Sequence, residues 1–255
     1  MTAPRRIADG AADTLRFTFD GRAVTARPGD TLAAALLANG VTLVARSFKY
    51  HRPRGIMAAG VEEANALVTV CEGGRTEPNT RATDVFVYDG LVARSQNVWP
   101  SLDFDIGVMN GMLARFLPAG FYYKTFFGPA SRWMIYERFI RRAAGLGKAP
   151  VVSDPDHFEH RGAFCDVLVV GGGPAGIQAA RDAAAAGGRV ILVEQDAVLG
   201  GSALRDGTAN PGLAPADVRV MLRTTASGNW DHGFVTLVER IAEPGQPLRY
   251  QSFTN

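Results

Sequence analysis

The stretch Asp166-Val-Leu-Val-Val-Gly-Gly-Gly-Pro-Ala-Gly176 decides how the second half of the chain folds. Its apolar run Val167–Val170 is rich in β-branched residues, which is typical of a buried parallel strand. Three glycines follow with the G-x-G-x-x-G spacing of a dinucleotide-binding turn. The pattern therefore predicts a strand, a tight turn and the start of a helix.

Each glycine of the motif has its own expected role. Gly171 allows the tight turn, Gly173 lets the backbone approach a pyrophosphate, and Gly176 lets the helix pack closely on the strand. The other positions of the turn are also candidate cofactor-binding residues: Gly172, Pro174 and Ala175.

The segment after the turn completes a strand-helix-strand pattern. Residues 177–186 are strong helix formers, and the positive end of the helix dipole would face the phosphates. Residues 189–194 predict the next parallel strand, and Glu194 closes it roughly 20 residues after the turn, where an acid holds the ribose hydroxyls. We count Gln195 beside it, and Gly200 and Gly201 in the following loop, as further cofactor-binding candidates.

The motif in this context predicts dinucleotide binding, with a glycine-rich turn around an empty site as the alternative. A carboxylate at Glu194 argues against NADP, because it would repel a 2′-phosphate. The motif by itself does not separate NAD from FAD. We expect NAD in this chain, with FAD as the alternative.

Composition limits the other classes of function. The 255 residues carry a formal charge of +2, which gives no reason to expect nucleic-acid binding. Two cysteines, Cys71 and Cys165, cannot form a disulfide framework, so we expect a reducing cytoplasm. We find no signal peptide and no apolar run near the roughly 18 residues of a membrane span, and expect no membrane association.

The first part of the chain predicts a small α+β domain. After a flexible tail at 1–13, alternation at 15–19 and 22–26 flanks the hairpin signal Asp20-Gly21, and a helix is expected at 32–38. We expect further strands at 67–71, 84–88 and 91–95, the last two as a second hairpin. The order strand, turn, strand, helix begins a β-grasp domain, which we place at 14–96.

Residues 97–160 predict an aromatic connector, with a helix at 131–144, and a linker. The connector is either structural or a docking surface for a partner subunit, because aromatic residues and arginine favour interfaces. Residues 161–255 predict a partial, Rossmann-like dinucleotide-binding domain with weaker strands at 218–224, 234–239 and 248–253. Because the sequence ends at Asn255, we expect a truncated domain that is not active as this chain alone.

Several further stretches carry a family resemblance. Together with the glycine motif, they resemble the N-terminal part of the α subunit of heterotetrameric sarcosine oxidase and of related opine and amine oxidase subunits. These stretches occur in the same order as in that family: Phe48–Gly55, Glu77–Thr83, Ser95–Leu102, Gly120–Phe126 and Ile140–Gly147.

The resemblance implies a role in a larger enzyme. In that family a β-grasp domain similar to plant-type ferredoxins precedes a domain that binds NAD. A β subunit carries FAD and oxidatively demethylates sarcosine to glycine, FMN at the subunit junction passes electrons to oxygen, and small γ and δ subunits complete the assembly. We expect no catalytic residue in this chain. The alternatives are a non-catalytic assembly module with an empty site, an opine or hydroxyproline dehydrogenase subunit, and an independent FAD-dependent oxidoreductase.

The expected fold class is thus α+β followed by α/β, with no iron–sulfur cluster. In ferredoxin-like relatives a cysteine cluster would follow the Arg-Pro-Arg-Gly segment, but Ile56–Gly60 contains no cysteine. Cys71 alone cannot hold a [2Fe–2S] cluster, which needs four thiolates.

Overall fold

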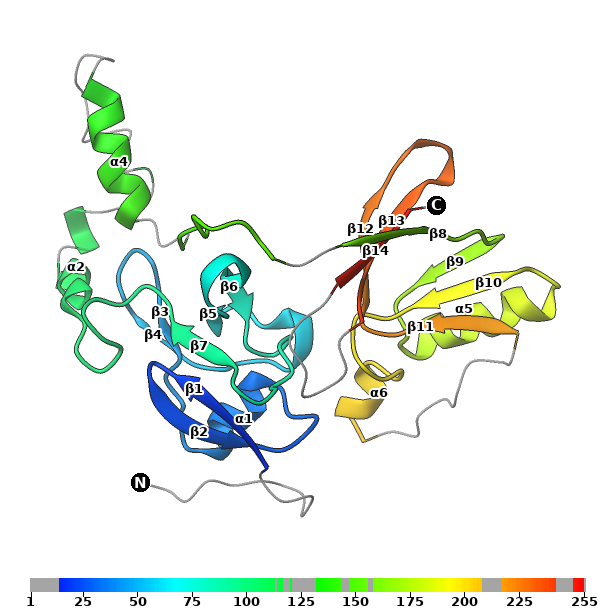
Figure 1. Ribbon diagram of the computed structural model, residues 1–255, viewed down its shortest axis with the longest axis horizontal. Coiled ribbons are helices and arrows are strands. Elements are labelled where there is room, and N and C mark those ends of the chain that lie inside the picture. Colours follow the sequence, from blue (N-terminus) through cyan, green and yellow to red (C-terminus); the bar gives the residue numbers. More distant parts are fainter. Residues whose placement is uncertain are drawn as a thin grey trace. The chain divides into compact units, whose positions relative to one another are not determined.

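The computed structural model describes residues 14–112, 114–116, 120, 132–143, 147–155, 158–207, 217–241 and 250–254. The chain forms two compact units, one containing the described residues up to Pro155 and the other those that follow (Figure 1). The predicted tail at 1–13 and the aromatic stretch 121–127 lie outside the described residues.

A five-stranded sheet with the order β2-β1-β7-β5-β6 forms the centre of the first unit. β1 and β2 are an antiparallel hairpin, whereas β7 runs parallel to β1 and antiparallel to β5. The strands are β1 (Leu15–Phe19), β2 (Arg22–Ala26), β5 (Leu67–Val70), β6 (Glu77–Arg81) and β7 (Val92–Ser95). β1, β2 and helix α1 (Leu32–Ala38) have the bounds that the sequence predicts.

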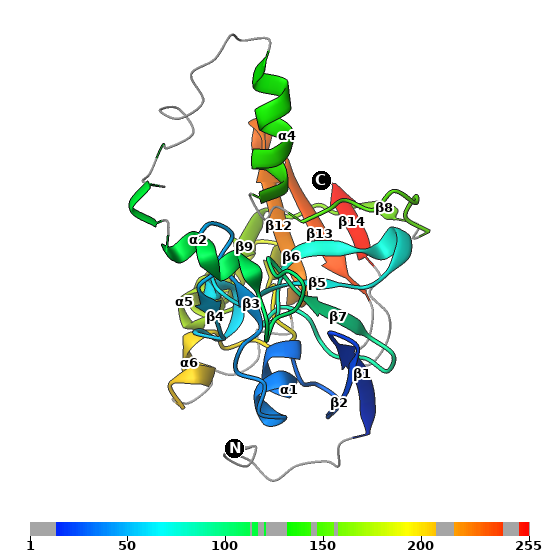
Figure 2. The same ribbon diagram turned by 90° about the vertical axis from the view of Figure 1, so that its left-hand side faces the viewer.

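The core of the first unit lies between this sheet and α1 (Figure 2). Alternation along β1 turns Phe17 and Phe19 to the same face, where they are 2% and 4% exposed. Leu32 and Leu36, four positions apart on α1, are fully buried against them. One apolar face from each element thus explains why these segments fold together.

The prediction of a second hairpin, with strands at 84–88 and 91–95, is wrong. Residues 84–88 form no strand beyond an isolated bridge between Thr31 and Phe86, and β7 pairs with β1 and β5 instead. The backbone of this segment is used at the start of α1, since the Val85 carbonyl accepts the N–H of Leu32 at 2.7 Å. β6, which pairs with β5, was not expected from the sequence.

Further elements of the first unit lie between the strands of the large sheet or follow β7. The two-residue strands β3 (Ala45–Arg46) and β4 (Pro53–Arg54) pair antiparallel. The remaining short elements are η1 (Gly60–Glu62), η2 (Gly73–Arg75), η3 (Ile106–Val108), α2 (Met109–Met112), η4 (Ala114–Phe116) and α4 (Trp133–Ala143).

A parallel three-stranded sheet with the order β11-β10-β9 forms the centre of the second unit. The strands are β9 (Val167–Val170), β10 (Val190–Val193) and β11 (Val218–Met221). Helix α5 (Pro174–Ala185) connects β9 to β10 and packs on one face of the sheet through Ile177 and Ala180 (Figure 1). All four residues of β10 are buried, as expected for a strand covered on both faces.

A second sheet, with the order β12-β13-β14-β8, covers the other face of β10 and β11. Its strands are β12 (Thr224–Asn229), β13 (Val235–Arg240), β14 (Tyr250–Thr254) and β8 (Glu159–Gly162). Leu237 of β13 packs with Ile191 and Met221. Short elements α6 (Ser202–Arg205) and η6 (Asp231–Gly233) lie between the strands.

The structure corrects two sequence predictions for the second unit. Residues 159–160, expected in the linker, belong to β8. The single strand expected at 218–224 is divided between β11 and β12 because Arg223 has φ +53°, a left-handed conformation that ends an extended strand. In the part of the chain that the structure describes, no helix is long and apolar enough to span a membrane.

Candidate dinucleotide-binding site

The glycine turn, Gly171–Gly176, connects the carboxyl end of β9 to the start of α5. Gly171 has φ +103° and donates its N–H to the Val193 carbonyl at 2.8 Å. A Cβ added at Gly176 would overlap the carbonyl oxygen of Gly171. The fold therefore requires glycine at both positions, one for its backbone angle and the other for its close packing.

Gly173 differs from these two glycines. It is the N-cap of α5 with φ −75° and ψ −179°, which any residue can adopt, and an added Cβ would meet nothing within 4 Å. No side chain caps the helix, and Pro174 occupies its first position. The N–H groups of Ala175 and Gly176 have no partner within the helix, because they belong to its first turn. This helix start can thus accept an anion.

Glu194, which follows β10, fixes the glycine turn through the hydrogen bonds of its carboxylate. Glu194 is 7% exposed, and its Oε2 accepts the N–H of Gly172 at 2.6 Å. Oε1 accepts the N–H of Asp196 at 2.9 Å. Each carboxylate oxygen has capacity for a further donor, so binding of a ribose hydroxyl stays a prediction. Sequence reasoning did not anticipate the bond to Gly172, which joins residues 22 positions apart.

The loop Leu199–Gly201 packs against the same turn. Gly200 donates its N–H to the Gly172 carbonyl at 2.8 Å, and a Cβ added at Gly201 would lie 3.0 Å from the Gly173 Cα. Leu199 is buried, and a Cβ added at Gly172 would overlap its side chain. The structure therefore brings both predicted glycine segments together. Gln195 lies exposed after Glu194.

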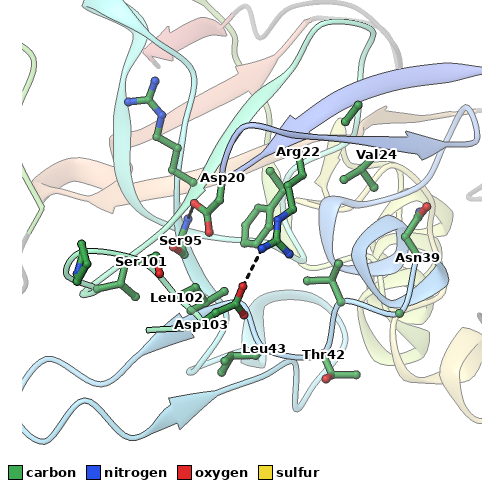
Figure 3. A pocket seen from close by; sticks show the side chains of 17 residues that line it. Asp20, Arg22, Val24, Asn39, Thr42, Leu43, Ser95, Ser101, Leu102 and Asp103 are labelled. Carbon is green, nitrogen blue, oxygen red and sulfur yellow. Dashed lines mark hydrogen bonds and ion pairs between the residues drawn. The ribbon is translucent and has the colours of Figure 1, made fainter. Parts of the chain in front are cut away.

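A cavity of 770 Å³ lies in the first unit, away from these residues in the chain (Figure 3). Arg22 and Asp103 form an ion pair of 2.7 Å beside it, and Asp20 accepts the N–H of Ser95 at 2.8 Å. Sequence reasoning did not single out this cavity. Of the four charged residues that line it, Arg22 pairs with Asp103, Arg94 pairs with Glu72 and Asp20 accepts a backbone N–H, so these charges are already engaged within the unit.

Each of the two units matches a different protein-family model. Residues 166–244, which contain the glycine turn, match the model of FAD dependent oxidoreductases. Residues 12–98 match the model of a 2Fe-2S iron-sulfur cluster binding domain. The second unit is thus similar to FAD dependent oxidoreductases, and the first unit is similar to 2Fe-2S iron-sulfur cluster binding domains.

Comparison with curated protein sequences gives a more specific similarity. The chain is 57% identical over 242 residues to sarcosine oxidase subunit alpha of Rhizobium meliloti (strain 1021), covering 89% of this chain and 24% of the relative. It is 33% identical to sarcosine oxidase subunit alpha of Corynebacterium sp. (strain P-1), covering 89% of this chain and 21% of the relative. The predicted resemblance to sarcosine oxidase alpha subunits is confirmed, and the chain spans less than a quarter of these relatives.

The chain also resembles solved structures in its fold. The crystal structure of L-proline dehydrogenase from P. horikoshii matches with a TM-score of 0.56 and 20% sequence identity. The match covers 99% of this chain and 41% of that chain. At this identity the likeness concerns the fold alone.

The predicted choice of NAD over FAD is wrong, because the second unit matches FAD dependent oxidoreductases. The physical reason for the error is that a glycine turn contacts the pyrophosphate and ribose, which both dinucleotides contain. The expectation of a first domain without a cluster is also wrong, because residues 12–98 match a 2Fe-2S cluster binding domain. That expectation rested on the absence of cysteine from Ile56–Gly60 and on Cys71 standing alone, whereas the family model matches the domain as a whole.

The residues fit the two cofactors differently. The open space at Gly173 and the uncapped start of α5 fit the pyrophosphate of a dinucleotide. A [2Fe–2S] cluster of the plant type is held by four thiolates, and the sequence contains two cysteines, Cys71 and Cys165. These cysteines do not complete such a ligand set, so the function proposed below uses no cluster.

Proposed function

We propose that the second unit binds FAD and that the chain serves in the alpha subunit of a multi-subunit, flavin-dependent amine oxidoreductase of the sarcosine oxidase kind. The observation that carries this proposal is the open space at Gly173, in front of an uncapped helix start. Similarity to sarcosine oxidase alpha subunits supports the larger assignment.

Different residues of the site would bind different parts of FAD. The N–H groups at the start of α5 donate to the pyrophosphate, and Gly173 lets the phosphates approach the backbone. Glu194 fixes the turn through the Gly172 N–H and accepts a ribose hydroxyl with its remaining lone pairs. Gly200 and Gly201 close the other side of the turn.

The chain's contribution is to bind and orient the cofactor. A bound flavin supplies the capacity to accept electrons from an amine, which no side chain of the glycine turn provides. The substrate in this proposal is an N-methyl amine such as sarcosine, as the names of the relatives suggest. An opine or hydroxyproline dehydrogenase subunit is the alternative within the same chemistry.

The assembly proposed around this chain contains a flavoprotein β-like subunit and small γ- and δ-like subunits. An FMN at the subunit junction, with transfer of electrons to oxygen, and a cytoplasmic location stay predictions. The word subunit in the names of the relatives supports an assembly of this kind.

FAD binding by the purified chain tests the proposal. Quenching of FAD fluorescence is expected on titration, and denaturation of the complex should release intact FAD on chromatography. Gly173→Val should weaken binding by about 100-fold or more, since its side chain would occupy the pyrophosphate position, and should leave the circular dichroism spectrum unchanged. Equal FAD affinity in the variant and the original chain would contradict the site. NAD bound more tightly than FAD would contradict the cofactor.

A further inference from the structure

Arg223, in the turn after β11, has a backbone conformation that arginine rarely adopts. Its φ is +53°, in the left-handed region, where any residue other than glycine is strained by its Cβ. The turn that ends β11 and begins β12 would therefore form more easily with glycine. Non-glycine residues that a fold holds in this region gather at ligand-binding sites, so this position is a candidate for binding.

Backbone hydrogen bonds hold this turn against the segment that follows β10. Arg223 donates its N–H to the Asp196 carbonyl at 3.0 Å. Thr224 donates its N–H to the Glu194 carbonyl at 2.8 Å, and Glu194 donates its own N–H to the Met221 carbonyl at 2.9 Å. Arg223 is thus fixed in the turn beside the residue that the proposed function assigns to the ribose.

The order of the strands gives the direction in which a dinucleotide would lie. β9, β10 and β11 run parallel, and β10 lies between the other two (Figure 1). Their carboxyl ends therefore share one edge of the sheet, where the glycine turn, Glu194 and Arg223 follow β9, β10 and β11 in that order. With the pyrophosphate at the start of α5 and the ribose at Glu194, the adenine comes next, at Arg223.

The guanidinium of Arg223 suits the face of an aromatic base. The group is planar and delocalised, and it stacks on aromatic rings. Stacking uses the face of the guanidinium and leaves the N–H donors at its edge for contacts within the protein. A 2′-phosphate is the other group that an arginine would bind here, but FAD has none and the Glu194 carboxylate would repel it.

We propose that Arg223 binds the adenine of FAD by stacking its guanidinium on the base. This inference rests on the proposed function and deepens it, because it assigns the adenine to the turn between β11 and β12. The glycine turn and Glu194 bind the pyrophosphate and the ribose, whereas Arg223 contacts the base. Ligands that carry adenosine and a pyrophosphate therefore share this contact, whatever follows the pyrophosphate.

The test measures binding of FAD and of ADP by the purified chain with and without the Arg223 side chain. FAD is titrated by fluorescence quenching, and ADP is measured by its displacement of bound FAD. Arg223→Gly should weaken binding of both ligands by about ten-fold or more, because both carry adenosine. Its free energy of unfolding in urea should not fall, because glycine adopts φ +53° without strain. Arg219→Ala is the matched control, since this exposed arginine lies on β11 and its removal should change neither affinity.

Arg223→Lys separates stacking from charge and leaves the backbone strain unchanged. Lysine keeps the positive charge but has no planar group, so this variant should lose as much affinity as Arg223→Gly and unfold at the same urea concentration as the original chain.

Three results would overturn this inference and leave the proposed function intact, provided that the original chain binds FAD. They are unchanged FAD affinity in Arg223→Gly or Arg223→Lys, a loss of affinity for FAD without a loss for ADP, and equal losses in Arg223→Gly and Arg219→Ala. Absence of FAD binding by the original chain would instead overturn the proposed function, and the inference with it.

Discussion

The residues before α1 and α5 have similar backbone conformations, but a side chain caps only α1. Thr31, before α1, has φ −74° and ψ 158°, and its side chain accepts the N–H of Ala34 at 3.2 Å. Gly173, before α5, has φ −75° and ψ −179°, and no side chain caps that helix. A threonine, serine or aspartate would fit the backbone at Gly173 and would satisfy the helix.

This difference shows what the second helix start provides. At α1 the donors of the first turn are satisfied within the fold, which stabilises the first unit. At α5 glycine stands where the backbone does not require it, and the position that its Cβ would occupy is open. The donors are thereby kept for a ligand, and the stability that a cap would provide is given up for binding.

The largest expected loss of stability follows Gly176→Ala. The new methyl group would overlap the Gly171 carbonyl, which belongs to the backbone of the turn and cannot rotate away. We expect the free energy of unfolding of the second unit to fall by about 3 kcal/mol, with loss of FAD binding. Urea denaturation followed by circular dichroism measures the change. Gly187→Ala is a useful comparison, because φ +86° strains it while its added Cβ meets no atom within 4 Å. An unchanged unfolding midpoint for Gly176→Ala would contradict the packing assigned to this glycine.

Glu63→Gln should destabilise the first unit by about 2 kcal/mol. Glu63 is 1% exposed, and its carboxylate oxygens accept the N–H groups of Met57, Ala58, Asn65 and Ala66 at 2.6 to 3.0 Å. The glutamine amide has one oxygen, so its NH₂ group would face backbone donors. Thermal unfolding of this variant measures the loss, with Glu62→Gln as control, and equal melting temperatures for the two variants would argue against the role of Glu63.

The same carboxylate predicts how stability depends on pH. Burial raises the pKa of Glu63, but the four backbone hydrogen bonds outweigh it and hold the pKa below its ordinary value of 4.5. A lowered pKa in the folded state means that the stabilisation is complete above about pH 4.5 and is lost as the pH falls through the folded value. Denaturation measured at several acidic pH values should show this loss in the original chain and not in Glu63→Gln.

Thr31→Ala should have the smallest effect, a loss of about 1 kcal/mol in the first unit, because it removes the cap of α1. FAD affinity should not change, since Thr31 belongs to the other unit. Chemical denaturation and FAD titration of the same preparation test both parts. A change in FAD affinity would contradict the separation of roles between the two helix starts.

Local sequence patterns were sufficient to predict the elements that form through contacts between residues close together in the chain. β1 and β2 follow from alternation around the turn Asp20-Gly21, and α1 has the bounds expected for the helix at 32–38. Pairings between distant segments were not predicted, because β7 could in principle pair with 84–88 or with β1. In the structure β7 pairs with β1, while Val85 and Val87 are buried in the core that also contains α1. Periodicity within one segment carries no information about such a choice.

The candidate site shows the same limit. The spacing of Gly171, Gly173 and Gly176 predicted a turn between strand and helix, which the structure contains. The bond from Glu194 to the Gly172 N–H depends on the position of β10 beside β9, which spacing does not specify. The choice between FAD and NAD depends on groups beyond the pyrophosphate and ribose, so the motif could not make it.

Gly173→Asp tests the central claim most directly. The aspartate fits the backbone and can cap α5 with its own carboxylate, in the position proposed for a phosphate. Urea denaturation and FAD titration are measured together on the variant and the original chain. We predict that stability stays equal or rises by a few tenths of a kcal/mol, while FAD affinity falls by about 100-fold or more. Retained FAD affinity, with or without a change in stability, would contradict the assignment of this helix start to the cofactor.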